Sequence, residues 1–238
     1  MIRSIVLATI FWLEMFVSML LFLVALMLEL FSDKVAQMFV YHVTHNWSKH
    51  GMRLAGVKIE VRGTEHLPVD KRIGFVSNHQ SYLDIPILLA AIPKPMGFIA
   101  KAELRKVPFI NQWMRVLRCT LVDRKNSSES IDALHKRIRL AEKGHPLVLF
   151  PEGTRAKNGK MRRFKTGGVH LFYEADLTLV PVTIDGSFRL LEAKNKLRPG
   201  NVIVTIHPFI NNKKQAASDY KEMTKRLQDT IESGLQHI

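Results

Sequence analysis

The sequence predicts an α/β fold with a central, mostly parallel sheet flanked by helices, preceded by an N-terminal two-helix hairpin that anchors the chain to a membrane. From residue 51 onward, short β-rich runs alternate with helical stretches, a pattern typical of parallel sheets with helical crossovers. The first fifty residues are instead apolar and carry no net charge. The length of 238 residues suits one α/β domain plus an appendage. We therefore divide the chain into residues 1–50, the anchor, and residues 51–238, the α/β domain.

The N-terminal segment reads as two helices of different character. Residues 4–31 contain no Lys, Arg, Pro or Gly, and Glu14 separates two uncharged runs that are each shorter than the roughly 18 residues of a membrane span. Residues 33–50 carry apolar side chains at three- and four-residue spacing, which predicts an amphipathic helix. We expect a hairpin that spans the membrane or dips into one leaflet, and Glu14 favours partial insertion. The alternative is a helical pair that covers a soluble core.

The α/β domain divides into strands and helices by the length and pattern of its apolar runs. Short β-rich or apolar runs predict strands at 57–61, 73–77, 97–100, 119–122, 146–150, 179–184 and 202–207. Longer runs, several bounded by Pro or Gly, predict helices at 82–92, 108–117, 128–143, 167–174 and 216–235.

Charge and cysteine content narrow the function classes. The formal net charge is +14, and all of it lies in residues 51–238. A body this basic suits nucleic acid, an anionic membrane face or phosphate-bearing substrates. The single cysteine, Cys119, excludes an intrachain disulfide framework and a Cys-based zinc finger.

The first candidate site follows the strand predicted at 73–77. His79 would lie in the loop at the strand's carboxyl end, where α/β sheets bind ligands, and could act as a general base. On a continuous helix Asp84 would point about 140° away from it. The two can meet only if His79 lies in the turn and Asp84 in the first helical turn, where the carboxylate would hold the imidazole tautomer. The alternative is that Ser81 to Asp84 forms a simple S-x-x-D capping signal.

The second candidate site follows the buried strand predicted at 146–150. Glu152, Gly153, Thr154 and Arg155 would be exposed at the carboxyl end of that strand. Gly153 permits a close backbone approach, and Arg155 offers a planar guanidinium that suits phosphate. The alternative is a solvated basic loop.

Taken together, these motifs resemble the glycerophospholipid acyltransferases. Asn78-His79-Gln80-Ser81-x-x-Asp84 is similar to their N-H-x-x-x-x-D motif, and Phe150-Pro-Glu-Gly-Thr-Arg155 to their F-P-E-G-T-R motif. The intermediate and later blocks also resemble theirs, in order and with typical spacing: Lys101, Leu104, Pro108-Phe109, Asp123-Arg124, Phe164-Lys165-x-Gly167 and Val180-Pro181-Val182. The N-H-Q-S form looks most like the 1-acylglycerol-3-phosphate acyltransferases. One departure is Arg118-Cys119-Thr120, where many members have a glycine-containing segment.

The resemblance implies acyl transfer from acyl-CoA or acyl carrier protein, as co-substrate, to the free hydroxyl of lysophosphatidic acid, giving phosphatidic acid. It implies that His79 removes the hydroxyl proton and that Asp84 orients and supports His79. Arg155, with Arg124 and Lys101, would bind the acceptor phosphate. Glu152 would position the acceptor or order Arg155 and Thr154, and Gly153 would let the backbone approach the substrate and help form an oxyanion site. The mechanism needs no metal, no other cofactor and no acyl-enzyme on Cys119.

The resemblance also implies a place and partners for the protein. The expected partners are membrane lipids and the two substrates, with the catalytic domain on the cytoplasmic face. Within the enzyme class, the alternatives are acceptors such as another lysophospholipid or glycerol-3-phosphate. A basic nucleic-acid or membrane-binding module without catalysis is the alternative from another class, but the sequence has no nucleic-acid-binding motif and we expect no such partner.

Overall fold

The computed structural model describes residues 2–69, 72–123, 127–175, 177–210 and 219–236, and in them seven strands form one sheet. The order of the strands is β1-β7-β6-β2-β5-β3-β4. In sequence they are β1 (Val57–Arg62), β2 (Ile73–Ser77), β3 (Gly97–Lys101), β4 (Thr120–Val122), β5 (Leu147–Leu149), β6 (Thr178–Asp185) and β7 (Gly200–Ile206). The α-helices are α1 (Ile2–Phe31), α2 (Asp33–Leu54), α3 (Asp84–Ala91), α4 (Ile110–Val116), α5 (Ser127–Glu142), α6 (Thr166–Glu174), α7 (Ser187–Leu190) and α8 (Tyr220–Ser233).

The sheet is mostly parallel, as predicted. Strands β6, β2, β5, β3 and β4 are joined by parallel pairs. Strand β7 runs antiparallel to β6 and parallel to β1, so it inserts between the first strand and the rest of the sheet. The predicted fold class is therefore confirmed, and the single antiparallel pair is the detail that residue patterns did not reveal.

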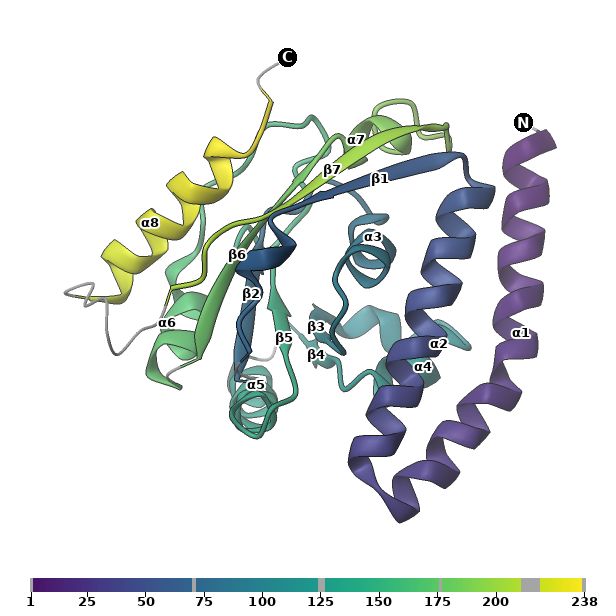
Figure 1. The fold of residues 1–238 in the computed structure, drawn as a ribbon, viewed down its shortest axis with the longest axis horizontal. Coiled ribbons are helices and arrows are strands. Elements are labelled where there is room, and N and C mark those ends of the chain that lie inside the picture. The colour runs from purple at the N-terminus through teal and green to yellow at the C-terminus, as the bar shows by residue number, and fades with distance from the viewer. Residues whose placement is uncertain (1, 70–71, 124–126, 176, 211–218, 237–238) are drawn as a thin grey trace.

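Helices cover both faces of the sheet (Figure 1). On one face lie α2 and α3, whose residues Met52, Ile87 and Leu88 pack with the strand residues Phe75 and Val182. On the other face lie α5, α6 and α8, which bury a second cluster that includes Ile138, Val169, Phe172, Met223, Leu227 and Ile231. Every residue of strands β2, β5 and β6 is buried, and these strands run between the two helical layers.

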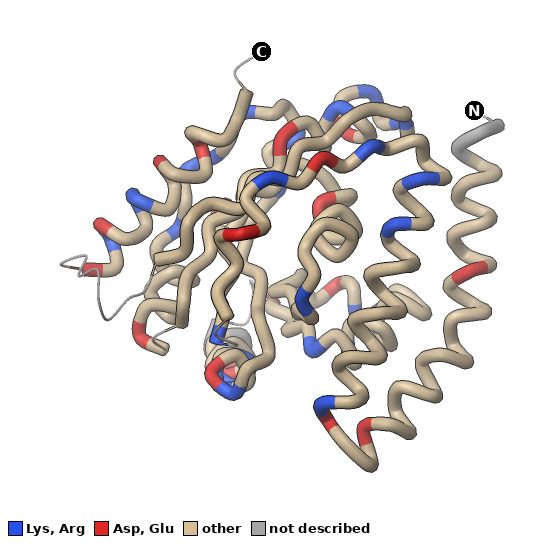
Figure 2. Tube along the Cα trace, in the orientation of Figure 1, with Lys and Arg blue, Asp and Glu red and all other residues tan. Residues whose placement is uncertain are grey.

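The N-terminal segment forms the predicted helical hairpin. The hydroxyl of Ser32 accepts a hydrogen bond from the N–H of Val35 at 3.4 Å and caps α2. Helix α2 continues to Leu54, past the boundary predicted at residue 50, because Met52 and Ala55 belong to the core beside the sheet. Helix α1 lies outside α2 and carries almost no charge along its length (Figures 1 and 2).

Glu14 faces α2, its partner in the hairpin. The indole Nε1 of Trp47 donates to its Oε2 at 3.0 Å, and Nε2 of His50 lies 3.2 Å from its Oε1. The expectation that Glu14 favours partial insertion stays a prediction. The carboxylate is satisfied by α2 and leaves the outer face of α1 apolar.

Ionic contacts fasten the hairpin turn to the α/β domain. The guanidinium of Arg118 pairs with Asp33 and lies 3.6 Å from Glu29, on either side of the turn. Arg118 has a φ of 56°, in the left-handed region that favours glycine. Here the side chain compensates by holding the hairpin. Nearby, burial and the charges of Arg118 and Arg137 lower the pKa of His145 to about 4, so this imidazole is neutral at pH 7.

Candidate active site

Three adjacent parallel strands end at one edge of the sheet, and each is followed by a loop or helix that carries functional side chains. These strands are β5, β2 and β6, which are neighbours in the sheet order. His79 follows β2, the residues from Glu152 to Arg155 follow β5, and Ser187 follows β6. The carboxyl ends of these strands therefore bring together segments that are distant in sequence, at the position where α/β sheets bind ligands.

His79 and Asp84 are in contact, in the one arrangement that their five-residue spacing allows. Nδ1 of His79 lies 2.7 Å from Oδ2 of Asp84, with the histidine in the turn and the aspartate as the first residue of α3. The Asp84 side chain is 0% exposed and that of His79 is 19% exposed. A buried carboxylate on Nδ1 leaves Nε2 to exchange a proton with a ligand, because the two ring nitrogens have separate partners.

The Asp84 carboxylate is held by three further donors. Its Oδ2 accepts the backbone N–H groups of Gln80 at 2.7 Å and Ser81 at 2.9 Å. Its Oδ1 accepts the hydroxyl of Ser187 at 2.5 Å. The N-cap of α3 is Leu83, which makes no side-chain cap, and the hydroxyl of Ser81 instead accepts the N–H of Leu83 at 3.0 Å within the turn. The alternative of a simple S-x-x-D cap is therefore wrong, and the His–Asp pair is present. Sequence reasoning missed Ser187, the first residue of α7, which reaches Asp84 from the segment that follows β6.

The imidazole of His79 is also fixed by stacking. Its ring lies parallel to that of Phe150, with centroids 4.3 Å apart and planes inclined by 20°. Within the described part of the chain, no hydrogen bond involves Nε2. The ring is therefore restrained at Nδ1 and on one face, while Nε2 remains available.

The neighbours of His79 in the motif have structural roles. Asn78 pairs with Ile184 of β6 through two hydrogen bonds of 2.8 Å, one in each direction. The side-chain oxygen of Gln80 accepts the N–H of Gly186 at 3.2 Å. These bonds tie the loop after β2 to the end of β6, and so place Ser187 beside Asp84.

Glu152 connects the two motif loops. Its carboxylate is buried, and its oxygens accept the N–H of His79 at 2.7 Å and the N–H of Arg162 at 2.8 Å. Burial raises the pKa of Glu152 to about 7, against the opposing effect of these two N–H groups. No hydrogen bond of the described residues joins the Glu152 carboxylate to Arg155 or Thr154, and a role of Glu152 in positioning the acceptor stays a prediction. Glu152 supports the backbone of His79.

Gly153 is needed for a turn. Its φ of 69° lies in the left-handed region, and its N–H donates to the carbonyl of Phe150 at 3.0 Å. That N–H is occupied within the turn, and a part for Gly153 in an oxyanion site stays a prediction.

Arg155 is held on two sides. Its Nη1 donates to Oε1 of Glu192 at 2.8 Å, and its guanidinium carbon lies 3.3 Å from the centroid of the Tyr82 ring. Neither Tyr82 nor Glu192 was predicted as part of the site. Tyr82 lies between His79 and Asp84 in the first motif, whereas no local signal marked Glu192.

The other predicted binding residues lie at the margins of this arrangement. Lys101 is the exposed last residue of β3, and no hydrogen bond or ion pair of the described residues joins it to the other candidates. Thr154 is partly exposed between Gly153 and Arg155. The prediction for Arg124 falls outside the described residues.

A large apolar cavity lies between the hairpin and the α/β domain. Its volume is about 930 Å³, and its walls include residues from α1, α2, α4, β3 and the start of α3: Met15, Val43, Leu83, Phe98, Trp113 and Leu117. Tyr82 and Cys119 also line it. Burial raises the pKa of the Cys119 thiol to about 11, so this sulfur is protonated at neutral pH and is a poor nucleophile.

Metal-ligand chemistry has no visible basis in the described ranges, which hold no group of three or more His, Cys, Asp or Glu side chains suited to a metal ion. The side chains that the candidate site brings together are an imidazole, its carboxylate and a guanidinium held by Glu192.

Comparison with known proteins gives consistent similarities. The family model "Acyltransferase" matches residues 58–185. The chain is 34% identical over 160 residues to the chloroplastic 1-acyl-sn-glycerol-3-phosphate acyltransferase LPAT1 of Arabidopsis thaliana, which covers 66% of this chain and 45% of that protein. It is 28% identical over 191 residues to the 1-acyl-sn-glycerol-3-phosphate acyltransferase of Borreliella burgdorferi, covering 80% of this chain and 76% of that protein.

A solved structure matches nearly the whole chain. The crystal structure of the 1-acyl-sn-glycerophosphate (LPA) acyltransferase PlsC from Thermotoga maritima superposes with a TM-score of 0.83 at 26% identity, covering 98% of this chain and 95% of that one. Among curated relatives, the matched region spans 45% of the Arabidopsis protein and 57% of a probable 1-acyl-sn-glycerol-3-phosphate acyltransferase of Mycoplasma pneumoniae. The chain thus spans about half the length of these two relatives.

Proposed function

Because the chain belongs to the acyltransferase family, we propose that it transfers a fatty acyl group from an acyl thioester to the free hydroxyl of 1-acylglycerol-3-phosphate, giving phosphatidic acid. The observation that carries this proposal is the 2.7 Å hydrogen bond between His79 and the fully buried Asp84. The names of the relatives supply the acceptor.

The chemistry follows from the free nitrogen of His79. As the acceptor oxygen attacks the thioester carbonyl, Nε2 takes the hydroxyl proton, and Asp84 stabilises the imidazolium that forms. The tetrahedral intermediate then collapses, the carbon–sulfur bond breaks, and the imidazolium returns the proton to the leaving sulfur. The high pKa of Cys119 favours this direct transfer over an acyl-cysteine intermediate.

Arg155 suits the phosphate of the acceptor. A guanidinium presents five N–H donors, and the bond from Nη1 to Glu192 uses one of them. The remaining donors can pair with phosphate oxygens in the planar geometry that favours arginine over lysine. Lys101 and Arg124 remain proposed contributors to the same charge.

The apolar cavity suits an acyl chain. Its walls are almost entirely hydrophobic, and Tyr82 lies both on its lining and under the guanidinium of Arg155. A lipid whose phosphate binds Arg155 would therefore have the cavity beside its headgroup. Apolar lining with few polar groups is the usual composition of a lipid or small-molecule pocket.

Helix α1 supports membrane association. Its stretch Ile5–Phe31 is 27 residues long and apolar enough to cross a membrane by length and composition. Its outward side chains are exposed and hydrophobic, among them Leu13, Phe16, Val17, Leu20, Leu23, Leu30 and Phe31. With α2 packed on the α/β domain, this face would place the site at the membrane surface, and we propose that the α/β domain lies on the cytoplasmic side.

The test is an acyl-transfer assay on the full chain. Radiolabelled acyl-CoA and acyl carrier protein thioester are each offered with lysophosphatidic acid, glycerol-3-phosphate and other lysophospholipids. We expect phosphatidic acid to form fastest, and the donor comparison identifies the co-substrate. Absence of turnover with lysophosphatidic acid from either donor would refute the proposal.

Ser187→Ala should reduce kcat about tenfold. The substitution removes the hydroxyl that donates to Oδ1 of Asp84, and a hydrogen bond to a charged group contributes roughly 1.5–3 kcal/mol. Ser187→Thr keeps the hydroxyl and should restore most of the rate. Ser233→Ala, which removes a serine hydrogen bond in α8, is the matched control. If Ser187→Ala lowers only the melting temperature and leaves kcat unchanged, the hydroxyl has no part in supporting Asp84.

A double variant Leu20→Glu/Leu23→Glu should weaken binding to anionic vesicles at least tenfold. Both side chains are exposed on α1, and carboxylates there would have to enter the lipid. Val69→Glu, at an apolar position of the α/β domain that is 97% exposed, is the control for the added charge. Vesicle flotation measures the effect, and equal binding by wild type and the double variant would exclude α1 as the membrane contact.

A further inference from the structure

Glu192 joins three segments of the candidate active site. It follows α7, and its side chain is 5% exposed. Its Oε1 accepts both the Nη1 of Arg155, at 2.8 Å, and the backbone N–H of Tyr82, at 2.9 Å. One carboxylate oxygen thus links the loop after β5 to the loop after β2.

The bond to Glu192 and the Tyr82 ring restrain the guanidinium in different directions. The ion pair with Glu192 acts in the plane of the guanidinium, at Nη1. The Tyr82 ring covers one face of that plane, with its centroid 3.3 Å from the guanidinium carbon. In the described residues, no other hydrogen bond of the guanidinium is found. Arg155 is therefore oriented by one N–H and one face, and its other N–H groups remain for a ligand.

The second oxygen of Glu192 shows that the carboxylate is not optimised for stability. Oε2 is buried and has no hydrogen-bond partner within the described part of the chain. A buried polar atom without a partner costs about 1–3 kcal/mol, and more when the group is charged. A negative charge beside Arg155 also opposes the binding of a phosphate. An acid with two such costs at this place needs a benefit that outweighs them.

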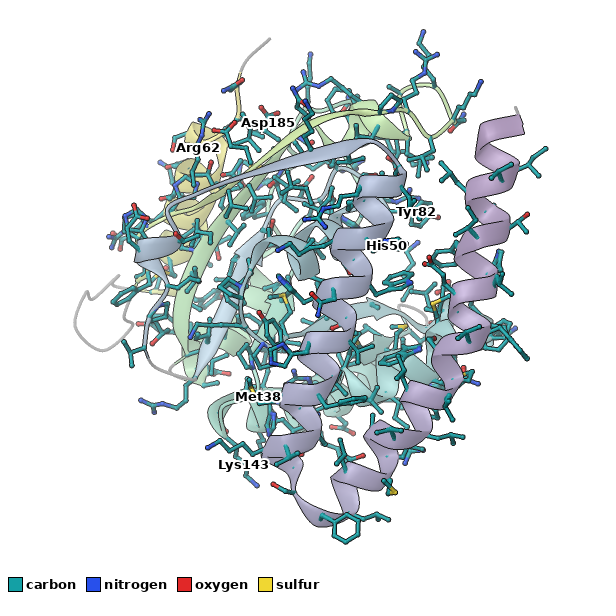
Figure 3. The ribbon with its side chains drawn as sticks, turned by 45° about the vertical axis from the view of Figure 1, so that its right-hand side comes forward. Met38, His50, Arg62, Tyr82, Lys143 and Asp185 are labelled. Atoms are coloured by element: carbon teal, nitrogen blue, oxygen red, sulfur yellow. The ribbon has the colours of Figure 1, made fainter. Side chains whose placement is uncertain are left out.

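We propose that Glu192 is a positioning residue for the acceptor headgroup, which holds the guanidinium of Arg155 over Tyr82 so that its free edge meets the phosphate. This inference rests on the proposed function, because it assigns the phosphate of the acceptor to Arg155. Tyr82 lines the apolar cavity and supports Arg155, so the clamp of Glu192, Arg155 and Tyr82 stands where cavity and headgroup site meet. Figure 3 labels Tyr82 on the side of the molecule that faces α1.

Two substitutions of Glu192 distinguish its orienting of Arg155 from the effect of its negative charge on phosphate binding. Glu192→Ala and Glu192→Gln both remove the negative charge, but glutamine keeps an oxygen that can accept from Arg155 and Tyr82. Positioning predicts that Glu192→Ala raises KM for lysophosphatidic acid about tenfold, while Glu192→Gln restores most of the affinity. If Glu192 acted only by repelling the phosphate, both variants would lower the KM for lysophosphatidic acid. Neither variant should change kcat or the KM of the acyl donor by more than about twofold, since the donor does not depend on this guanidinium.

A double-mutant cycle and controls complete the experiment. In an Arg155→Ala background, Glu192→Ala should have no further effect on KM, because the group it positions is absent. Glu60→Ala breaks the exposed pair of Glu60 with Arg62 and is the control. If Glu192→Ala does not fold, Glu192→Asp keeps the charge and shortens the reach, and it should also raise KM.

Equilibrium binding of lysophosphatidic acid without a donor, measured by calorimetry, separates this inference from the proposed function. Wild type that binds the lipid without turning it over would refute the function, and the variants would still test the clamp. An unchanged or lowered affinity in both Glu192→Ala and Glu192→Asp overturns the inference, whatever the turnover. If the wild-type protein does not bind lysophosphatidic acid, both the proposed function and the inference about Glu192 are overturned.

Discussion

His79→Ala should lower kcat by about 10²–10⁴-fold, the range expected when a general base is lost, and leave the protein folded. The imidazole contributes little to the core, because its side chain is partly exposed and its bonds serve a loop. Removing it leaves the Asp84 carboxylate with three of its four donors, the N–H groups of Gln80 and Ser81 and the hydroxyl of Ser187. The loss should therefore fall on turnover and not on stability.

A matched control is available in α6. His170 lies 3.3 Å from the carboxylate of Glu174, away from the strand ends that carry the site, so His170→Ala removes a histidine paired with an acid outside it. Initial rates at saturating acceptor and donor, with melting curves for each variant, give the comparison. Near-wild-type turnover by His79→Ala would rule out His79 as the base.

Arg155→Ala should raise KM for lysophosphatidic acid by about 10–100-fold, which corresponds to losing roughly 1.5–3 kcal/mol of charge-assisted hydrogen bonding. The kcat should change far less, since the phosphate contact is made in both the ground state and the transition state. The substitution also leaves Glu192 as a buried carboxylate without its cation, so melting temperature must be measured alongside.

Arg163→Ala is the control for this prediction, because Arg163 is an exposed arginine of the basic stretch in the same long loop. If both variants raise KM equally, the acceptor is attracted by diffuse positive charge and not by a fixed guanidinium. If Arg155→Ala weakens only the acyl donor, the phosphate of the acceptor does not bind there.

Residue patterns predicted the parts of this protein that depend on local sequence. The alternation of short strands and helices predicted the mostly parallel sheet. The five-residue spacing of His79 and Asp84 permitted one geometry for contact, and the structure adopts it. Such features depend on residues that are close together in the sequence, so periodicity and spacing predict them.

Other features depend on contacts between distant segments, and no local pattern encodes them. Ser187 reaches Asp84, and Glu192 reaches Arg155, only because β6 lies beside β2 and brings its following residues to the same edge. The bonds of Glu152 to the backbone of His79 and Arg162 were missed for the same reason. A glutamate in an exposed-looking motif gave no sign that its carboxylate would be buried under the backbone of His79.

Helix α1 forms part of the wall of the apolar cavity while its opposite side is exposed and hydrophobic. A lipid could therefore pass from bilayer to protein without its chain crossing water, and the bilayer itself would compete for that chain. For such an arrangement the concentration that governs turnover is the mole fraction of acceptor in the membrane. Diluting the acceptor with inert lipid at constant bulk concentration should then slow the reaction, whereas adding buffer should not.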